Sequence, residues 1–171
     1  EFEPFDMIYG DTINDAFPPY HLFTQEFNED IATLLNQRGM YLVHVVDAFE
    51  HGHFLAAVIR TCRETFASID VIALNQSAEI RGSFMVVCSR EPRDLKPALL
   101  DLQRRQGWKG AHLPVSTIED LLERTRPVVL TDNHAPVEHL LMAAVKKETV
   151  DVIALHVKTA YSYLEKGKKS L

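Results

Sequence analysis

The order of strand-like and helix-like patterns in the first half of the chain constrains its fold most strongly. Strand-like apolar runs occupy residues 5–10, 40–46, 69–74 and 83–89. Helical spacing of apolar side chains separates the first three runs. The linker NQSAEIRG between the last two runs is too short for a crossover helix, so these two strands should pair antiparallel. The sequence therefore predicts an α/β domain with the order β-α-β-α-β-β.

Two helices are expected between the first three strands. Thr24 is a suitable N-cap for the first helix, and Gly39 is expected to end it. The residues with helical spacing are Phe27, Ile31, Leu34 and Leu35 in the first helix and Phe54, Ala57, Val58, Thr61 and Cys62 in the second. These side chains should face the sheet. Cys62 and Cys88 both lie in apolar segments and are expected to be small buried thiols.

No glycine-rich nucleotide-binding turn is present in the sequence. None of the seven glycines forms a Gly-x-Gly pair. In a dinucleotide-type sheet such a turn follows the first strand, and an acidic residue for the ribose comes later. Residues 5–10 are expected to form a buried strand, and the acid Asp11 follows it directly. Such a strand usually lies in the middle of a sheet of this kind. We therefore expect the chain to be the second half of a larger catalytic unit.

The second half of the sequence is expected to be helical. We divide the chain into a sheet domain at 1–90 and a helical extension at 91–171 packed on it. Helix-start signals occur at Asp94, at Ser116 with Glu119 in capping-box spacing, and at Pro136. A further apolar stripe runs from Val150 to Leu164.

Composition excludes several classes of function. The net charge of -6 argues against a general nucleic-acid binder, which needs a basic face. The histidines have no His-Glu-x-x-His spacing and the cysteines form no pair motif, so no metal site is expected. No apolar run approaches the roughly 20 residues of a membrane span, and no signal peptide opens the chain. Two cysteines without a pairing pattern suggest a reducing compartment, and we expect a cytoplasmic location.

Two motifs carry a resemblance to a known family. GDTINDAFPPYHLFTQEF occupies residues 10–27, and LTDNHAPVEHL occupies residues 130–140. The first is similar to the segment after the fourth strand of spermidine synthase-like proteins, with Leu22, Thr24 and Glu26 at matching positions. The second resembles a stretch near the end of bacterial spermidine synthase-like domains, including domains fused to membrane segments. The resemblance covers roughly residues 1 to 145.

The resemblance implies a class I S-adenosylmethionine-dependent methyltransferase fold. Here it would be an incomplete Rossmann-like methyltransferase sheet, its second half with the last strand antiparallel, and a helical C-terminal extension. The intact ancestor would transfer an aminopropyl or a methyl group from an S-adenosylmethionine-type donor to an amine. The complete domain would bind S-adenosylmethionine or its decarboxylated form, whereas this truncated chain is expected to be inactive and without cofactor. The alternative is a non-catalytic binding or assembly module on the same scaffold.

The same resemblance suggests the residues of the site. Asp11 stands at the family's catalytic acid position, where it would accept a proton from the amine or orient it by charge. The expected substrate-binding residues are Asp15, Tyr20, His21, Asp132 and Glu138. An acidic and aromatic lining suits a polyamine cation. Asp132 has a second interpretation, since it could satisfy helix N-terminal amides before Pro136. His44 lies inside a strand and is interpreted as a core or cleft-edge histidine.

The strand at Phe5–Gly10 is expected to need a partner. An apolar edge strand with free N–H and C=O groups is an association hazard unless it is covered. Three candidates are a second copy of the chain, a missing N-terminal half, and the helix at 150–164. A homodimer is the simplest, because a two-fold axis satisfies both copies with one surface. Beyond these, a small amine is the expected ligand, and the parent protein could be membrane-attached.

Overall fold

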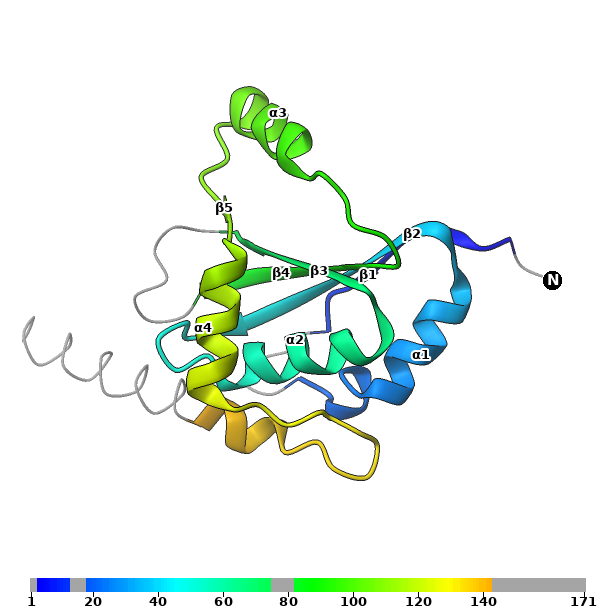
Figure 1. Cartoon of the computed structure of the whole chain (residues 1–171), viewed down its shortest axis with the longest axis vertical. Helices are drawn as coiled ribbons and strands as arrows, with labels where there is room; N and C mark the ends of the chain where they lie inside the picture. Colours follow the sequence, from blue (N-terminus) through cyan, green and yellow to red (C-terminus); the bar gives the residue numbers. More distant parts are fainter. Residues whose placement is uncertain (1–2, 13–17, 75–81, 143–171) are drawn as a thin grey trace, which may run out of the picture.

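An open five-stranded sheet organises the part of the chain that the computed structural model describes, residues 3–12, 18–74 and 82–142 (Figure 1). Its strand order is β1-β2-β4-β3-β5. The strands are β1 (Phe5–Gly10), β2 (Leu35–Asp47), β3 (Ser68–Ala73), β4 (Gly82–Ser89) and β5 (Ala111–His112). β1 is parallel to β2, whereas β4 lies between β2 and β3 and is antiparallel to both. The predicted antiparallel pair and the α/β fold class are therefore confirmed.

Helices cover one face of this sheet. The structure describes the helices α1 (Gln25–Leu34), α2 (His53–Thr65), α3 (Lys96–Gln106) and α4 (Val115–Thr125), with a 3-10 turn η1 at Tyr20–Leu22. Residues 137–142 are also helical, as the signal at Pro136 predicted. α1 and α2 lie on the same side of the sheet, and α4 packs on α2. α3 stands apart on the other side of the sheet, above it in Figure 1, and has no buried residue. The two faces of the sheet are therefore unequal.

The first helix is shorter than the sequence predicted. Thr24 is its N-cap as expected, and its hydroxyl accepts a hydrogen bond from the Phe27 N–H. The helix ends at Leu34, which is 46% exposed, so the prediction that Leu34 faces inward is wrong. Gly39 does not end this helix, because it lies within β2. A Cβ at Gly39 would approach the Phe5 carbonyl and the Leu35 side chain to 2.9 Å, which explains a glycine there.

The later helices also depart from the predictions. α4 begins at Val115 with Pro114 as its N-cap, and no side chain caps it, so the capping box at Ser116 does not form. Asp94 accepts a hydrogen bond from the Lys96 N–H at the start of α3, but that helix buries no apolar face. The predicted stripe from Val150 to Leu164 lies outside the described residues.

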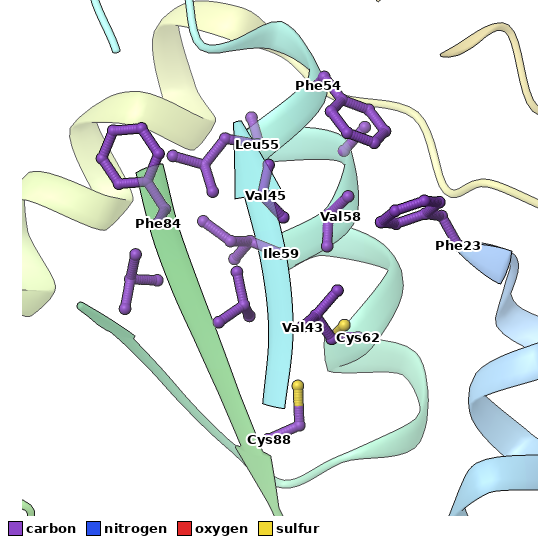
Figure 2. Packing of buried hydrophobic residues seen from close by; sticks show 14 of the residues in the cluster. Phe23, Val43, Val45, Phe54, Leu55, Val58, Ile59, Cys62, Phe84 and Cys88 are labelled. Atoms are coloured by element: carbon purple, nitrogen blue, oxygen red, sulfur yellow. The ribbon is translucent and has the colours of Figure 1, made fainter. Parts of the chain in front are cut away.

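The core lies between α2 and the centre of the sheet (Figure 2). Along β2, buried side chains alternate with half-buried ones, and Tyr41, Val43 and Val45 point toward α2. On α2, all five residues predicted to face the core are buried. Cys62 and Cys88 are free and buried, as predicted, and burial raises the pKa of the Cys88 thiol.

The opposite face of the sheet is lined by Met7, Tyr9, Met40, Leu42, His44 and Met85, and we call it the open face. The registers Met7–Met40, Tyr9–Leu42 and His44–Met85 place these side chains on one side. Within the described residues α1 and α2 lie on the other side, so the apolar side chains here keep contact with solvent.

No helix among the described residues has the length and apolarity that crossing a membrane requires.

Candidate functional site

Asp11 and His44 form a pair at the carboxyl ends of two neighbouring parallel strands. The register Gly10–Val43 brings the residue after β1 beside His44 of β2. The Nδ1 atom of His44 lies 2.9 Å from Oδ1 of Asp11. The Asp11 side chain is 52% exposed and that of His44 is 19% exposed. The carboxylate is therefore held by the strand beside it while remaining accessible to a ligand.

The hydrogen bonds of this pair define which atoms are free. A carboxylate can only accept a hydrogen bond, so the Asp11 carboxylate accepts from Nδ1–H of His44, and Nε2 is the other ring nitrogen of that histidine. Nε2 is buried, and the described residues give it no hydrogen-bond partner. Desolvation, with the charge and hydrogen bond of Asp11 adding to it, raises the pKa of the Tyr9 phenol.

The two sequence motifs lie side by side despite the distance between them in the chain. The Gln25 N–H at the start of α1 donates to the Leu130 carbonyl at 2.8 Å. The Thr24 hydroxyl donates to Oδ1 of Asp132 at 2.8 Å. The Leu130 N–H in turn donates to the Thr61 hydroxyl on α2 at 2.9 Å. These contacts join the second motif to the first turn of α1 and to the middle of α2.

Asp132 makes contacts that are typical of a structural residue at a helix N-terminus. Its side chain accepts from Thr24, the residue that caps α1, and its N–H donates to Glu26 at 3.1 Å. This places Asp132 at the start of a helix on the covered side of the sheet. Asp11 instead contacts His44, which belongs to the open face. The two carboxylates have separate partners on different sides of the sheet.

Tyr20 and Glu138 are brought together at a cavity of about 330 Å³. The cavity is lined by Pro18, Pro19, Tyr20, Ala135, Pro136, Val137, Glu138 and His139. Both motifs contribute to its wall, so two of the predicted substrate-binding residues share a hollow. The His21 ring meets the Tyr20 ring edge to face at 5.6 Å. Asp15 lies outside the described residues.

Asp47 is a buried carboxylate that sequence reasoning did not identify. It ends β2 with no exposed surface and accepts hydrogen bonds from the N–H groups of Ala48, Phe54 and Leu55 at 2.7, 3.0 and 2.9 Å. Burial raises its pKa, although the three N–H groups and His53 act in the opposite direction. The sequence signal was an acid at a strand end a few residues before a helix. Asp47 anchors the first turn of α2 rather than facing a ligand.

The described residues do not form a cradle for a nucleotide-type donor. Such a cradle needs a glycine whose missing Cβ leaves room for a ligand. A Cβ on Gly10, at the end of β1, would meet the Tyr41 side chain at 3.0 Å. Gly52, before α2, is in the left-handed region and packs against Leu121. Both glycines thus make room for protein atoms, and neither provides a cradle for S-adenosylmethionine.

Metal ligands do not gather in the described part of the chain. No group of three or more His, Cys, Asp or Glu side chains there could hold a metal ion. The His112–Asp70 pair, at 2.8 Å, joins β5 to β3. The Asp11–His44 pair differs from it, because it lies where two neighbouring parallel strands end.

Comparisons with known proteins place the fold. No protein-family model matches the chain, and no curated protein is significantly similar to it. A probable spermidine synthase from Corynebacterium glutamicum ATCC 13032 superposes with a TM-score of 0.58 and 19% identity, over 72% of this chain and 47% of that one. Human methyltransferase-like protein 13, solved in complex with SAH, gives a TM-score of 0.45 and 18% identity. The match covers 71% of this chain and 49% of that one. The chain spans about half the length of these structures. Its fold is therefore similar to that of a probable spermidine synthase.

Proposed function

We propose that this chain supplies the amine-binding side of a spermidine synthase-like transferase site. The complete site would move an aminopropyl or methyl group from an S-adenosylmethionine-type donor to an amine. One observation carries the proposal, namely that Asp11 is held by His44 at the carboxyl ends of two adjacent parallel strands. Ligands of open α/β sheets bind at this edge. The likeness in fold to a probable spermidine synthase supports it.

The proposal gives each residue of the pair a separate task. Asp11 accepts from His44 through Oδ1, and its half-exposed carboxylate can accept a further, charge-assisted hydrogen bond from an ammonium group. The carboxylate would orient the amine and would accept its proton as the nitrogen becomes a nucleophile. His44 is a positioning residue that fixes the carboxylate. Neither Gly10 nor Gly52 provides a cradle for the donor, so binding the donor is not assigned to this chain.

Replacing Asp11 by asparagine is expected to weaken amine binding. Asparagine keeps the shape of the side chain but removes the charge that attracts an ammonium group. We expect the dissociation constant for 1,4-diaminobutane to rise roughly tenfold, about 1.4 kcal/mol, because the ammonium group would then bond to a neutral oxygen instead of a charged one. Isothermal titration calorimetry at low ionic strength measures this change, since salt screens exposed charges.

Asp120→Asn is the matched control for this titration. Asp120 is an exposed carboxylate on α4, so its replacement changes the net charge by the same amount without touching the Asp11–His44 pair. Its effect on the dissociation constant should be small. Equal weakening by both substitutions would show that only net charge matters, and unchanged binding by Asp11→Asn would refute the assignment of Asp11.

The chain alone is expected to bind S-adenosylmethionine weakly. Neither Gly10 nor Gly52 leaves room for a nucleotide, and the described residues offer no other turn of that kind at the carboxyl edge of the sheet. We therefore expect a dissociation constant weaker than about 10 µM, which corresponds to about 7 kcal/mol of binding free energy. Calorimetric titration of the 171-residue chain measures it. Tighter binding would mean that this chain holds the donor itself, contrary to the proposal.

A further inference from the structure

We propose that the hollow between α3 and the start of β5 binds a small aromatic carboxylate. Its volume is about 270 Å³, and its lining residues are Lys96, Leu99, Leu100, Gln103, Trp108 and His112. None of them belongs to the Asp11–His44 pair, so this site does not depend on the proposed function. Three features of the hollow support the assignment: its apolar walls, the contacts that hold those walls, and the charge among its lining residues.

The walls of the hollow are mainly apolar. Four lining residues share one face of α3, because they have the spacing i, i+3, i+4 and i+7: Lys96, Leu99, Leu100 and Gln103. Leu100 is 40% exposed, and α3 buries no residue within the described part of the chain. Trp108, the single tryptophan of the sequence, adds an aromatic side chain to the lining. Apolar walls with a few polar groups are typical of small-molecule sites.

The walls are held by contacts at the base of α3. A Cβ on Gly110 would lie 1.8 Å from Cζ2 of Trp108, so the indole ring lies directly against the glycine backbone. The Gln103 side-chain amide donates to the Gly110 carbonyl at 3.3 Å. His112 contacts Asp70 at 2.8 Å, where β5 pairs with β3. A hollow whose walls are fixed in advance costs less ordering entropy when a ligand binds.

The charge among the lining residues favours an anion. Lys96 is exposed, and the described residues give its ammonium group no ion-pair partner. Asp94 accepts a hydrogen bond from the Lys96 N–H, but its side chain lines a different hollow. Asp101, also on α3, is paired with Arg105. Among the described residues no carboxylate lines this hollow, so the unpaired ammonium group is available to a ligand carboxylate.

The size of the hollow and its indole indicate the body of the ligand. Ligand pockets usually measure roughly 300–1,000 Å³, so a hollow of about 270 Å³ suits a compact molecule. Aromatic rings pack on an indole in offset or edge-to-face arrangements. A ring that carries one carboxylate can contact Trp108 and Lys96 together, whereas a neutral ring uses only the first and an inorganic anion only the second.

The test is a fluorescence titration of the 171-residue chain with 4-bromobenzoate, because bromine quenches an indole that it contacts. Trp108 is the single tryptophan, so selective excitation of the indole reports on this hollow alone. We expect saturable quenching with a dissociation constant below about 1 mM. 4-Bromobenzyl alcohol has the same ring without the charge, and it should bind at least about threefold more weakly.

Lys96→Gln removes the charge and keeps a polar side chain of similar length. It should raise the dissociation constant for 4-bromobenzoate at least about threefold and leave that for 4-bromobenzyl alcohol unchanged. Lys109→Gln is the matched control, since Lys109 is exposed close to α3 but does not line the hollow. Its effect on 4-bromobenzoate should be small.

Three results would overturn the proposal. The first is quenching that rises linearly and no more steeply than that of free N-acetyltryptophanamide, since collisions alone produce it. The second is equal binding of the carboxylate and the alcohol by the wild type, a comparison that needs no variant. The third is an equal effect of Lys96→Gln and Lys109→Gln, with circular dichroism showing that both variants are folded.

Discussion

Replacing Asp47 by alanine is expected to destabilise the fold by about 4 kcal/mol, because three buried N–H groups lose their acceptor. The Asp47 carboxylate accepts hydrogen bonds from Ala48 after β2 and from Phe54 and Leu55 in the first turn of α2. Alanine offers no acceptor, and the site has no exposed surface through which bulk water could replace it. Since domains of this size have roughly 5–15 kcal/mol of stability, the effect is large. Urea denaturation followed by circular dichroism measures it.

Asp47→Asn separates the loss of hydrogen bonds from the loss of charge. The amide oxygen can still accept from the first turn of α2, so the cost should be clearly smaller than that of alanine. The pKa of Asp47 is raised by burial. The folded state therefore binds its proton more tightly than the unfolded state, and ionisation as the pH rises above about 3.9 reduces the stability of the wild type. Wild type should thus lose stability relative to Asp47→Asn across that window. A constant difference between pH 4 and pH 7 would contradict the direction of this shift.

Replacing Phe54 by alanine is expected to cost about 3–5 kcal/mol, the usual range for a buried phenylalanine. Phe54 has no exposed surface, and its ring meets that of Phe23 at 5.1 Å, with an angle of 68° between the ring planes. Figure 2 shows it on α2 beside Phe23, at the edge of the cluster between helix and sheet. Removing the ring leaves a cavity that the rigid sheet cannot fill. The same denaturation experiment gives the change in the free energy of unfolding.

Val115→Ala is the control for this substitution. Val115 is 68% exposed at the start of α4, so its truncation removes little buried apolar surface. Its effect should stay within roughly 0.5 kcal/mol, as for most surface substitutions. If Phe54→Ala were as mild as the control, the packing between α2 and the start of α1 would not be the core that the burial values indicate.

The first four strands and their order along the chain could be predicted because their signals are local, whereas β5 and the placement of β4 between β2 and β3 were not predicted. Apolar runs marked β1 to β4, and the shortness of the linker before β4 determined its direction. Helical spacing on α2 identified its buried face, because that helix lies flat on the centre of the sheet. Such features follow directly from the spacing of apolar residues along the chain.

The helix features that were predicted wrongly depend on contacts between residues that are distant in the sequence. Gly39 resembled a helix end, but its position is set by the approach of the Phe5 carbonyl from β1. Leu34 fitted the helical stripe, but the chain turns into β2 at the next residue and leaves it exposed. α3 buries no residue within the described part of the chain, and periodicity alone does not reveal what a helix packs against.

The candidate site was only partly predictable, because its contacts also join residues that are distant in the sequence. Asp11 was identified because it follows a strand, but its partnership with His44 requires the parallel register of β1 and β2. Asp132 was considered for two roles, and only the contact with Thr24 favours the structural one. Asp47 was missed because its three hydrogen-bond donors become neighbours only when α2 folds back.

The antiparallel placement of β4 has a consequence for the order of folding. β3 and β4 are consecutive and can form a hairpin by closing a short loop, and β1, α1 and β2 form a second local unit. Pairing of β2 with β4 joins residues as far apart as Met40 and Ser89. Closing a longer loop costs more chain entropy, so local pairs tend to form first. We therefore expect the two local units to form early. β2 should pair with β4 later, when α2 packs against the sheet.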